Sequence, residues 1–126
     1  MEVGQNAAAT AVELVKERGA IIARLKPPDG AAFSDGACLA AFKDITAFAA
    51  KNRENGKKIR LVLNLGGLEY IQSTGVAGLI QLQNDLKTAG FELALAELSD
   101  SVGKIIAVMH LNNYFRIFAA EREALP

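Results

Sequence analysis

Residues 61–82 read LVLNLGGLEYIQSTGVAGLIQL, and this stretch decides what fold the rest of the chain can form. Across residues 59–65, apolar side chains alternate with Arg60, Val62 and Asn64, which is the period-two pattern of a β-strand. Val62 makes the second face of this strand partly apolar as well. The pattern therefore predicts an interior strand of a sheet that is covered, at least in part, on both faces.

The same stretch then changes from strand to helix. Gly66-Gly67 breaks the alternation, and from Thr74 onward apolar residues recur every three or four positions until Gly90, which is placed to end a helix. Residues with this spacing are Val76, Leu79, Ile80 and Leu86. Ser73 or Thr74 is accordingly predicted to be the N-cap.

Two interpretations of these hydroxyl groups remain open. In the first, they only satisfy backbone N–H groups at the helix start, which stabilises a helix by about 0.5–2 kcal/mol. In the second, the helix start is an anion or phosphoacceptor site, because no Asp or Glu occurs between Tyr70 and Asn84 to balance the positive end of the helix dipole. The first turn also contains small residues, which would leave open space for an anion: Gly75, Ala77 and Gly78.

The stretch resembles the core motif of the STAS domain, and in particular that of the anti-sigma factor antagonists. That motif is an apolar strand, Asp/Asn-Leu, a short loop, and Asp-Ser-Ser/Thr-Gly-Leu-Gly opening a helix; Asn64-Leu65 and Ser73-Thr74-Gly75 match it here. The resemblance implies an anti-sigma factor antagonist whose Ser73 is phosphorylated by a partner kinase that is itself the anti-sigma factor. We expect this phosphorylation to switch the antagonist off. It also implies a surface that binds this ATP-binding partner, formed by Tyr70, Gln72, Ser73, Thr74, Gly75 and Val76.

Gln72 departs from the family pattern, since it stands where the motif normally has Asp. Glutamine keeps hydrogen-bonding capacity but lacks the charge. Two alternative functions follow: a constitutive STAS scaffold or adaptor that is not phosphorylated, and an accessory subunit of a transport ATPase. Gln72 supports the first of these, and nothing in the sequence selects the second.

The remainder of the chain predicts an α/β fold. Within residues 10–26 the pattern fits either a short helix ending at Gly19 or a hairpin of two strands that turns at residues 17–19, and the STAS resemblance favours the hairpin. A helix is expected from Ser34 or Asp35 to about Asn52, with an apolar stripe through Leu39, Phe42 and Ile45 that indicates core packing. After the motif stretch we expect a strand around residues 91–96, a helix capped by Ser99 or Asp100, a strand at 115–118 and a last helical turn within 119–125. The resulting order is the STAS-like ββαβαβαβα, a mixed, mostly parallel sheet with helices packed on it.

Composition limits the classes of function. The 126 residues, 51% of them hydrophobic, fit a flexible tail at 1–9 and a single domain at 10–126. A formal net charge of zero disfavours nucleic acid as a partner, and the lack of a span or signal pattern predicts a cytoplasmic protein. One cysteine, Cys38, which we expect to be buried, and one histidine, His110, offer no zinc site. We also expect no cofactor and no catalytic group, because Ser73 has no neighbouring base in the sequence.

Overall fold

The computed structural model describes residues 12–17, 19–26, 35–53 and 58–126, and side chains in the first helix from Cys38 onward. The expected tail at 1–9 and the candidate cap Ser34 lie outside these residues. The described elements are, in order, β1 (Val12–Glu17), β2 (Ala20–Leu25), α1 (Asp35–Lys51), β3 (Ile59–Asn64), α2 (Ser73–Thr88), β4 (Phe91–Ala96), α3 (Asp100–Val108), β5 (Arg116–Phe118) and α4 (Glu121–Ala124). This is the predicted order, ββαβαβαβα.

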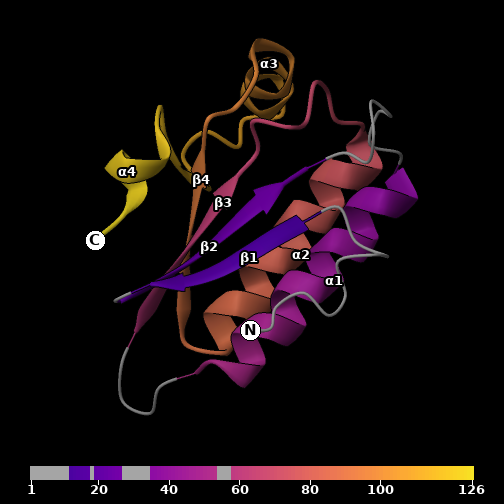
Figure 1. The fold of residues 1–126 in the computed structure, drawn as a ribbon. Helices are drawn as coiled ribbons and strands as arrows, with labels where there is room; N and C mark the ends of the chain where they lie inside the picture. Colours follow the sequence, from indigo (N-terminus) through magenta and orange to yellow (C-terminus); the bar gives the residue numbers. More distant parts are fainter. Residues whose placement is uncertain (1–11, 18, 27–34, 54–57) are drawn as a thin grey trace.

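The strands form one sheet in the order β1-β2-β3-β4-β5 (Figure 1). β1 is antiparallel to β2, whereas β2, β3, β4 and β5 pair with one another in parallel. The prediction of a mixed, mostly parallel sheet is confirmed. The chain runs up one strand and returns through a helix, so α2 and α3 both begin at the carboxyl ends of parallel strands.

The first two strands resolve the ambiguity at residues 10–26 in favour of the hairpin. Glu17 lies opposite Ala20 in the antiparallel register, and Gly19 at the turn has a φ of 74°, which glycine adopts at little cost. The alternative of a short helix ending at Gly19 is wrong, because Val12–Glu17 form β1 and pair with β2 along their whole length. Pairing across the sheet outweighs the local helical pattern.

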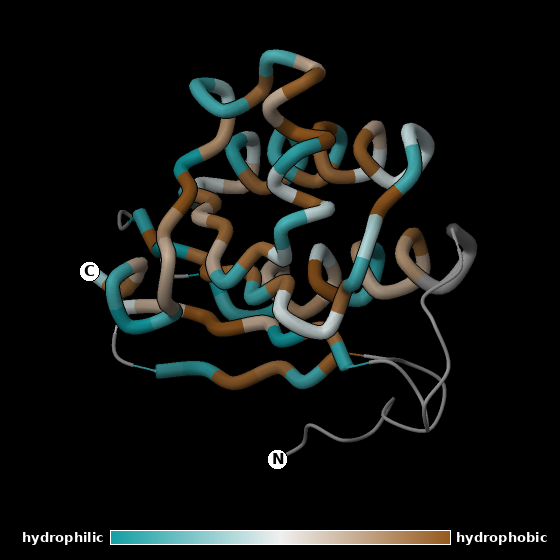
Figure 2. The backbone as a smooth tube through the Cα atoms, turned by 90° about the horizontal axis from the view of Figure 1, so that it is seen from above, coloured by the Kyte–Doolittle hydropathy of each residue, from teal (hydrophilic) through white to brown (hydrophobic). Residues whose placement is uncertain are grey.

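The two faces of the sheet are covered differently. Helices α1 and α2 lie on one face, where the large apolar core includes Ile21, Leu61, Leu63, Leu93 and Leu95 (Figure 1). The short helix α4 lies on the opposite face, where a small cluster contains Ile22, Val62, Ala94, Ala96 and Ala124. Val62 is therefore buried from the second side, as the sequence predicts. Figure 2 shows the corresponding alternation of hydrophobic and hydrophilic residues along the helices and strands.

Among the remaining expectations for individual residues and elements, several are confirmed and one is corrected. Cys38 is buried, β5 begins one residue later than expected, and the last helical turn is α4. Leu39 belongs to the apolar stripe that sequence assigns to the core, yet 44% of its surface is exposed. It lies at the margin of the contact between α1 and α2, where the stripe extends beyond the covered area. His110 follows α3 and is exposed.

Candidate functional site

The segment that carries the motif is the connection from β3 to α2, residues 65–72, which we call the motif loop. It is held from inside by two apolar side chains, Leu68 and Ile71, which are 1% and 5% exposed. Its backbone is bonded as well, because Leu65 N donates to Ala96 O (2.9 Å) and Leu68 N donates to Leu65 O (2.9 Å). The loop is thus a packed structure with a defined path.

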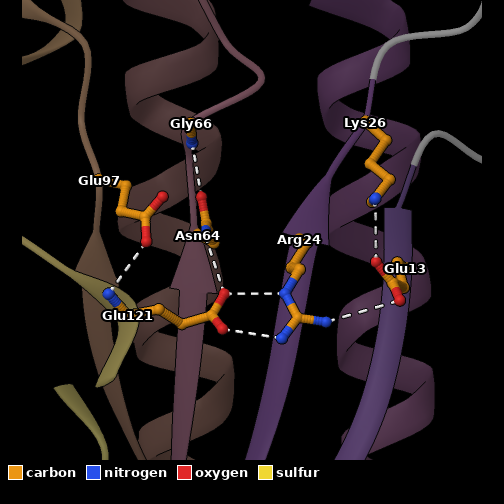
Figure 3. Close-up of polar contacts among 7 residues, drawn as sticks. All are labelled: Glu13, Arg24, Lys26, Asn64, Gly66, Glu97 and Glu121. Carbon is orange, nitrogen blue, oxygen red and sulfur yellow. Dashed lines mark hydrogen bonds and ion pairs between the residues drawn. The ribbon is translucent and has the colours of Figure 1, made fainter. Parts of the chain in front are cut away.

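Asn64, the last residue of β3, fixes the beginning of the motif loop. Its Oδ1 accepts a hydrogen bond from Gly66 N (2.7 Å), the bond of an Asx turn (Figure 3). Its Nδ2 donates a hydrogen bond to Oε2 of Glu121 (2.8 Å), and Glu121 belongs to α4. One amide side chain therefore joins the motif loop to the C-terminal helix, using both of its polar atoms.

Ser99 fixes the middle of the same loop from the other side. Its hydroxyl donates to Glu69 O (2.9 Å) and accepts from Val102 N (3.3 Å), so that it also caps α3. The prediction of Ser99 as a helix cap is confirmed. The bond to Glu69 could not be read from the sequence, because it joins positions 30 residues apart and no pattern relates them.

The start of α2 differs from the prediction. The N-cap is Gln72, with extended backbone angles (φ −98°, ψ 171°), and within the described residues its side chain makes no capping hydrogen bond. Gln72 O accepts from Val76 N (3.0 Å), which makes Ser73 and Thr74 the first two helical residues. The expectation that one of these hydroxyls is the N-cap is wrong, because the helix begins one residue earlier than the hydroxyl pattern indicates.

The side chains predicted to form a partner surface separate into two groups. Tyr70, Gln72, Ser73 and Thr74 are exposed, and Tyr70 retains 50% of its surface. Gly75 is buried and Val76 is 0% exposed, so neither can form the outer surface that the motif implies for them. Val76 lies under the helix start and supports it, since the apolar face of α2 must turn toward the sheet.

The glycines of the first turns do not leave the expected space for an anion. A Cβ at Gly75 would lie 2.7 Å from Ile71 Cγ1, and one at Gly78 would lie 2.6 Å from Leu39 Cδ2. Both positions are therefore close contacts, the first with the motif loop and the second with α1. The part of the helix start that remains open is its outer side, where Ser73, Thr74 and Ala77 are exposed.

The outer side of the helix start is electrostatically positive, because no acidic residue of the first turn balances the helix dipole. The first turn of α2 contains no acidic residue, and its backbone N–H groups point toward the loop end of the helix. The positive end of the helix dipole is consequently not balanced by a carboxylate within the turn. An exposed hydroxyl at Ser73, the first helical residue, lies where a negative group would be stabilised.

Sequence reasoning missed Leu39 as a neighbour of this surface. Its side chain lies beside Gly78 and is almost half exposed, so it adds an apolar contact area next to the start of α2. The apolar stripe of α1 identified Leu39 only as a core residue.

Across the part of the chain that the structure describes, no three His, Cys, Asp or Glu residues are grouped to hold a metal ion, and no helix has the length and hydropathy of a membrane span.

Comparison with known proteins places the motif in a family. A model of the STAS domain matches residues 37–124. Similar solved structures include a Thermotoga maritima protein assigned to the anti-sigma factor antagonists (TM-score 0.71, 16% identity, 90% of each chain covered). They also include the anti-sigma factor antagonist SpoIIAA in its unphosphorylated form (TM-score 0.66, 21% identity, 90% of this chain and 92% of that one). A third is a murine anion transporter, solute carrier 26 family member A9 (TM-score 0.69, 14% identity, 87% of this chain but 18% of the transporter).

These likenesses agree with the sheet order and the helix positions described above. The family match covers the stretch from the first turn of α1 to the end of α4, including the motif loop. The chain belongs to the STAS domain family.

Proposed function

We propose that the protein is an anti-sigma factor antagonist that binds a kinase-type anti-sigma factor and is switched off by phosphorylation of Ser73. Family membership and the likeness to SpoIIAA, an anti-sigma factor antagonist with a named unphosphorylated form, support this assignment. The binding surface consists of the exposed residues of the motif loop and the first turn of α2: Tyr70, Gln72, Ser73 and Thr74.

The observation that carries the proposal is the position of Ser73. It is exposed, it is the first residue of α2, and the turn that follows contains no acidic side chain. A kinase can reach such a hydroxyl without unfolding the helix. A phosphate there, carrying about −1.5 to −2 charge, would be stabilised within the protein by the N–H groups of the helix start.

The same phosphate would weaken binding to a partner. Ser73 lies within three residues of Tyr70, a half-exposed aromatic side chain of the kind that is common in interfaces. When a partner covers this surface, a phosphate next to Tyr70 must lose its hydration, which costs free energy of binding. A partner without a matching basic pocket does not offset that cost with an ion pair. Binding and phosphorylation at one surface therefore exclude each other.

The proposal is tested by incubating the protein with ATP and a neighbouring or co-purifying kinase-type ATPase, followed by intact-mass measurement and peptide mapping. We expect one added phosphate, on Ser73, and none in Ser73→Ala. Ser101→Ala is the matched control, because Ser101 is also exposed in the first turn of a helix and even follows an Asp. Phosphate on Ser101, or none at all with a kinase that binds, would contradict the proposal.

Binding gives a second test that does not depend on kinase activity. Ser73→Asp should bind the partner at least tenfold more weakly than Ser73→Ala, because it places a negative charge on the surface that the partner covers. The two affinities can be compared by calorimetry. Equal affinities would mean that Ser73 lies outside the interface.

Gln72 favours one alternative, a constitutive adaptor that binds through the same surface without modification. Its side chain is exposed at the N-cap and neutral, where the family motif has a carboxylate that could assist phosphoryl transfer. Gln72→Asp separates the two functions. If phosphorylation is absent in the natural protein and appears in this variant, the natural protein acts as the adaptor.

A further inference from the structure

The second face of the sheet contains a group of polar side chains that joins the C-terminal helix to the motif loop. We define the Glu121 cluster as Arg24 of β2, Asn64 of β3 and Glu121 of α4 (Figure 3). The Glu121 carboxylate accepts from Arg24 Nε (2.9 Å) and Arg24 Nη2 (2.8 Å), a bidentate pair. The same carboxylate accepts from Asn64 Nδ2 (2.8 Å).

This cluster is half-enclosed and not a freely solvated surface pair. The side chains of Arg24 and Glu121 retain 30% and 18% of their surface. Hydrogen bonds from Arg24, with a smaller contribution from Asn64, hold the pKa of the Glu121 carboxyl below its usual value. The carboxylate is thus charged at neutral pH and held in one orientation by three donors.

Helix α4 depends on contacts of this kind. Four residues form a single turn, which is too short to be stable in isolation. It is attached by the Glu121 cluster, by Arg60 Nη1 donating to Ala124 O (2.9 Å), and by Glu121 N donating to Glu97 Oε2 (3.1 Å). Ala124 adds a buried contact with Ile22 and Val62.

Asn64 is the residue through which α4 can influence the motif loop. Its amide group has one orientation in which Nδ2 meets Glu121 while Oδ1 accepts from Gly66 N. Without Glu121, the amide can rotate and the bond to Gly66 is no longer enforced. The side chain at position 64 must also be an amide, because an Asp there would place a second carboxylate about 2.8 Å from the carboxylate of Glu121.

We propose that Glu121 is a positioning residue for the motif loop. Arg24 holds the Glu121 carboxylate, the carboxylate fixes the Asn64 amide, and the amide fixes the turn at Gly66. Detachment of α4 therefore loosens the loop that leads to Ser73. Any effect on phosphorylation rests on the function proposed above, whereas the positioning itself does not. The middle of the loop has a separate anchor, the hydrogen bond from Ser99 to Glu69 O, so the loosening is greatest at the beginning of the loop.

The test uses nitrogen-15 relaxation and amide solvent exchange of the whole chain, without any partner. In Glu121→Ala we expect the Gly66 amide to exchange roughly three- to tenfold faster, with a lower order parameter at Gly66 and Gly67 than at Glu69. Glu123→Ala is the matched control, because Glu123 is an exposed carboxylate on the same helical turn. It should leave these values unchanged.

A rescue experiment distinguishes positioning from general destabilisation. Asn64→Asp should loosen Gly66, and adding Glu121→Gln should restore much of its protection, because the glutamine amide can donate to the new carboxylate. Unchanged Gly66 exchange in Glu121→Ala would overturn the proposal. So would an equal acceleration of Gly66 and of core amides such as Leu63, or the absence of rescue. Since no kinase is involved, failure here and failure of the phosphorylation experiment are separate results.

Discussion

Helices α2 and α3 both begin at the carboxyl ends of parallel strands, but their first turns are built from different parts. At α3, Ser99 caps the backbone with its hydroxyl and Asp100 supplies a charge that suits the dipole. At α2, Gln72 makes no capping bond within the described residues, no acid follows, and Ser73 is exposed. One start is stabilised by a side-chain cap and an acidic residue, whereas within the described residues the other has neither.

The two starts also differ in the space around their glycines. Gly75 of α2 faces Ile71 closely, while around the position that a Cβ of Gly103 in α3 would take, no described atom lies within 4 Å apart from its chain neighbours and the backbone of its own helix. The start of α2 is therefore closely packed on its inner side and open on its outer side. The following variants test this contrast, in order of decreasing expected effect.

Gly75→Ala should have the largest effect. The new methyl group would lie 2.7 Å from Ile71 Cγ1, on a buried branched side chain with little freedom to move. We expect the free energy of unfolding to fall by about 1–3 kcal/mol, as in overpacked cores. Urea denaturation measures it, and an unchanged midpoint would show that the loop moves away easily.

Ser99→Ala comes next. It removes the cap of α3 and the hydrogen bond to Glu69 O, and should lower the free energy of unfolding by about 0.5–2 kcal/mol. Because the lost bond also holds the motif loop, the amide exchange of residues 68–70 should accelerate more than that of β3. Equal acceleration in both segments would show that the bond to Glu69 has no local effect.

Gly103→Ala should act in the opposite direction. Its methyl group meets open space within a regular helix, and replacing glycine by alanine at such a position stabilises by about 0.5–1 kcal/mol. Thermal melting followed by circular dichroism measures the change. Together with Gly75→Ala, this variant compares the same substitution in the first turns of α2 and α3. A loss of stability in both variants would contradict the inferred difference in packing between the two helix starts.

Gln72→Asp should stabilise α2 modestly. A carboxylate at the N-cap can accept from the backbone N–H groups and offset the dipole, which contributes about 0.3–1 kcal/mol. The gain should shrink in 1 M salt, where exposed charges are screened. If stability does not change, the N–H groups of this turn are already satisfied.

Ser73→Ala should have the smallest effect on stability, within about 0.5 kcal/mol, since its side chain is exposed and does not cap the helix. A melting temperature close to that of the natural protein is the expected result. This neutrality also makes it a clean variant for the phosphorylation experiment. A large loss would indicate that the hydroxyl is part of the folded structure.

Periodicity was sufficient for the elements from Ile59 to Val108, where strand and helix periods alternate clearly. It left residues 10–26 open between a helix and a hairpin, and only the STAS resemblance favoured the hairpin that the structure shows. The residues Asn64-Leu65 and Ser73-Thr74-Gly75 also singled out the β3 to α2 connection as the candidate site, through their resemblance to the STAS motif. Sequence reasoning placed the N-cap of α2 one residue too late, because adjacent Ser and Thr both fit a cap and the choice depends on how the preceding loop enters the helix.

Other features could not be predicted because they depend on partners distant in the chain. The glycines at 75 and 78 look like open space in the sequence, but their neighbours Ile71 and Leu39 come from the loop and from another helix. The bond between Asn64 and Glu121 joins residues 57 positions apart. Polar pairs of this kind have no periodicity, and only the folded sheet brings them together.

The attachment of α4 also has a consequence for folding. The pair of Arg24 and Glu121 spans 97 positions of the chain, so it forms only after all of these residues have been synthesised. Until then Ile22, Val62 and Ala94 lie on a sheet face without their final cover. A chain emerging from the ribosome would expose this apolar strip, and its last turn of helix would remove a surface on which growing chains can associate.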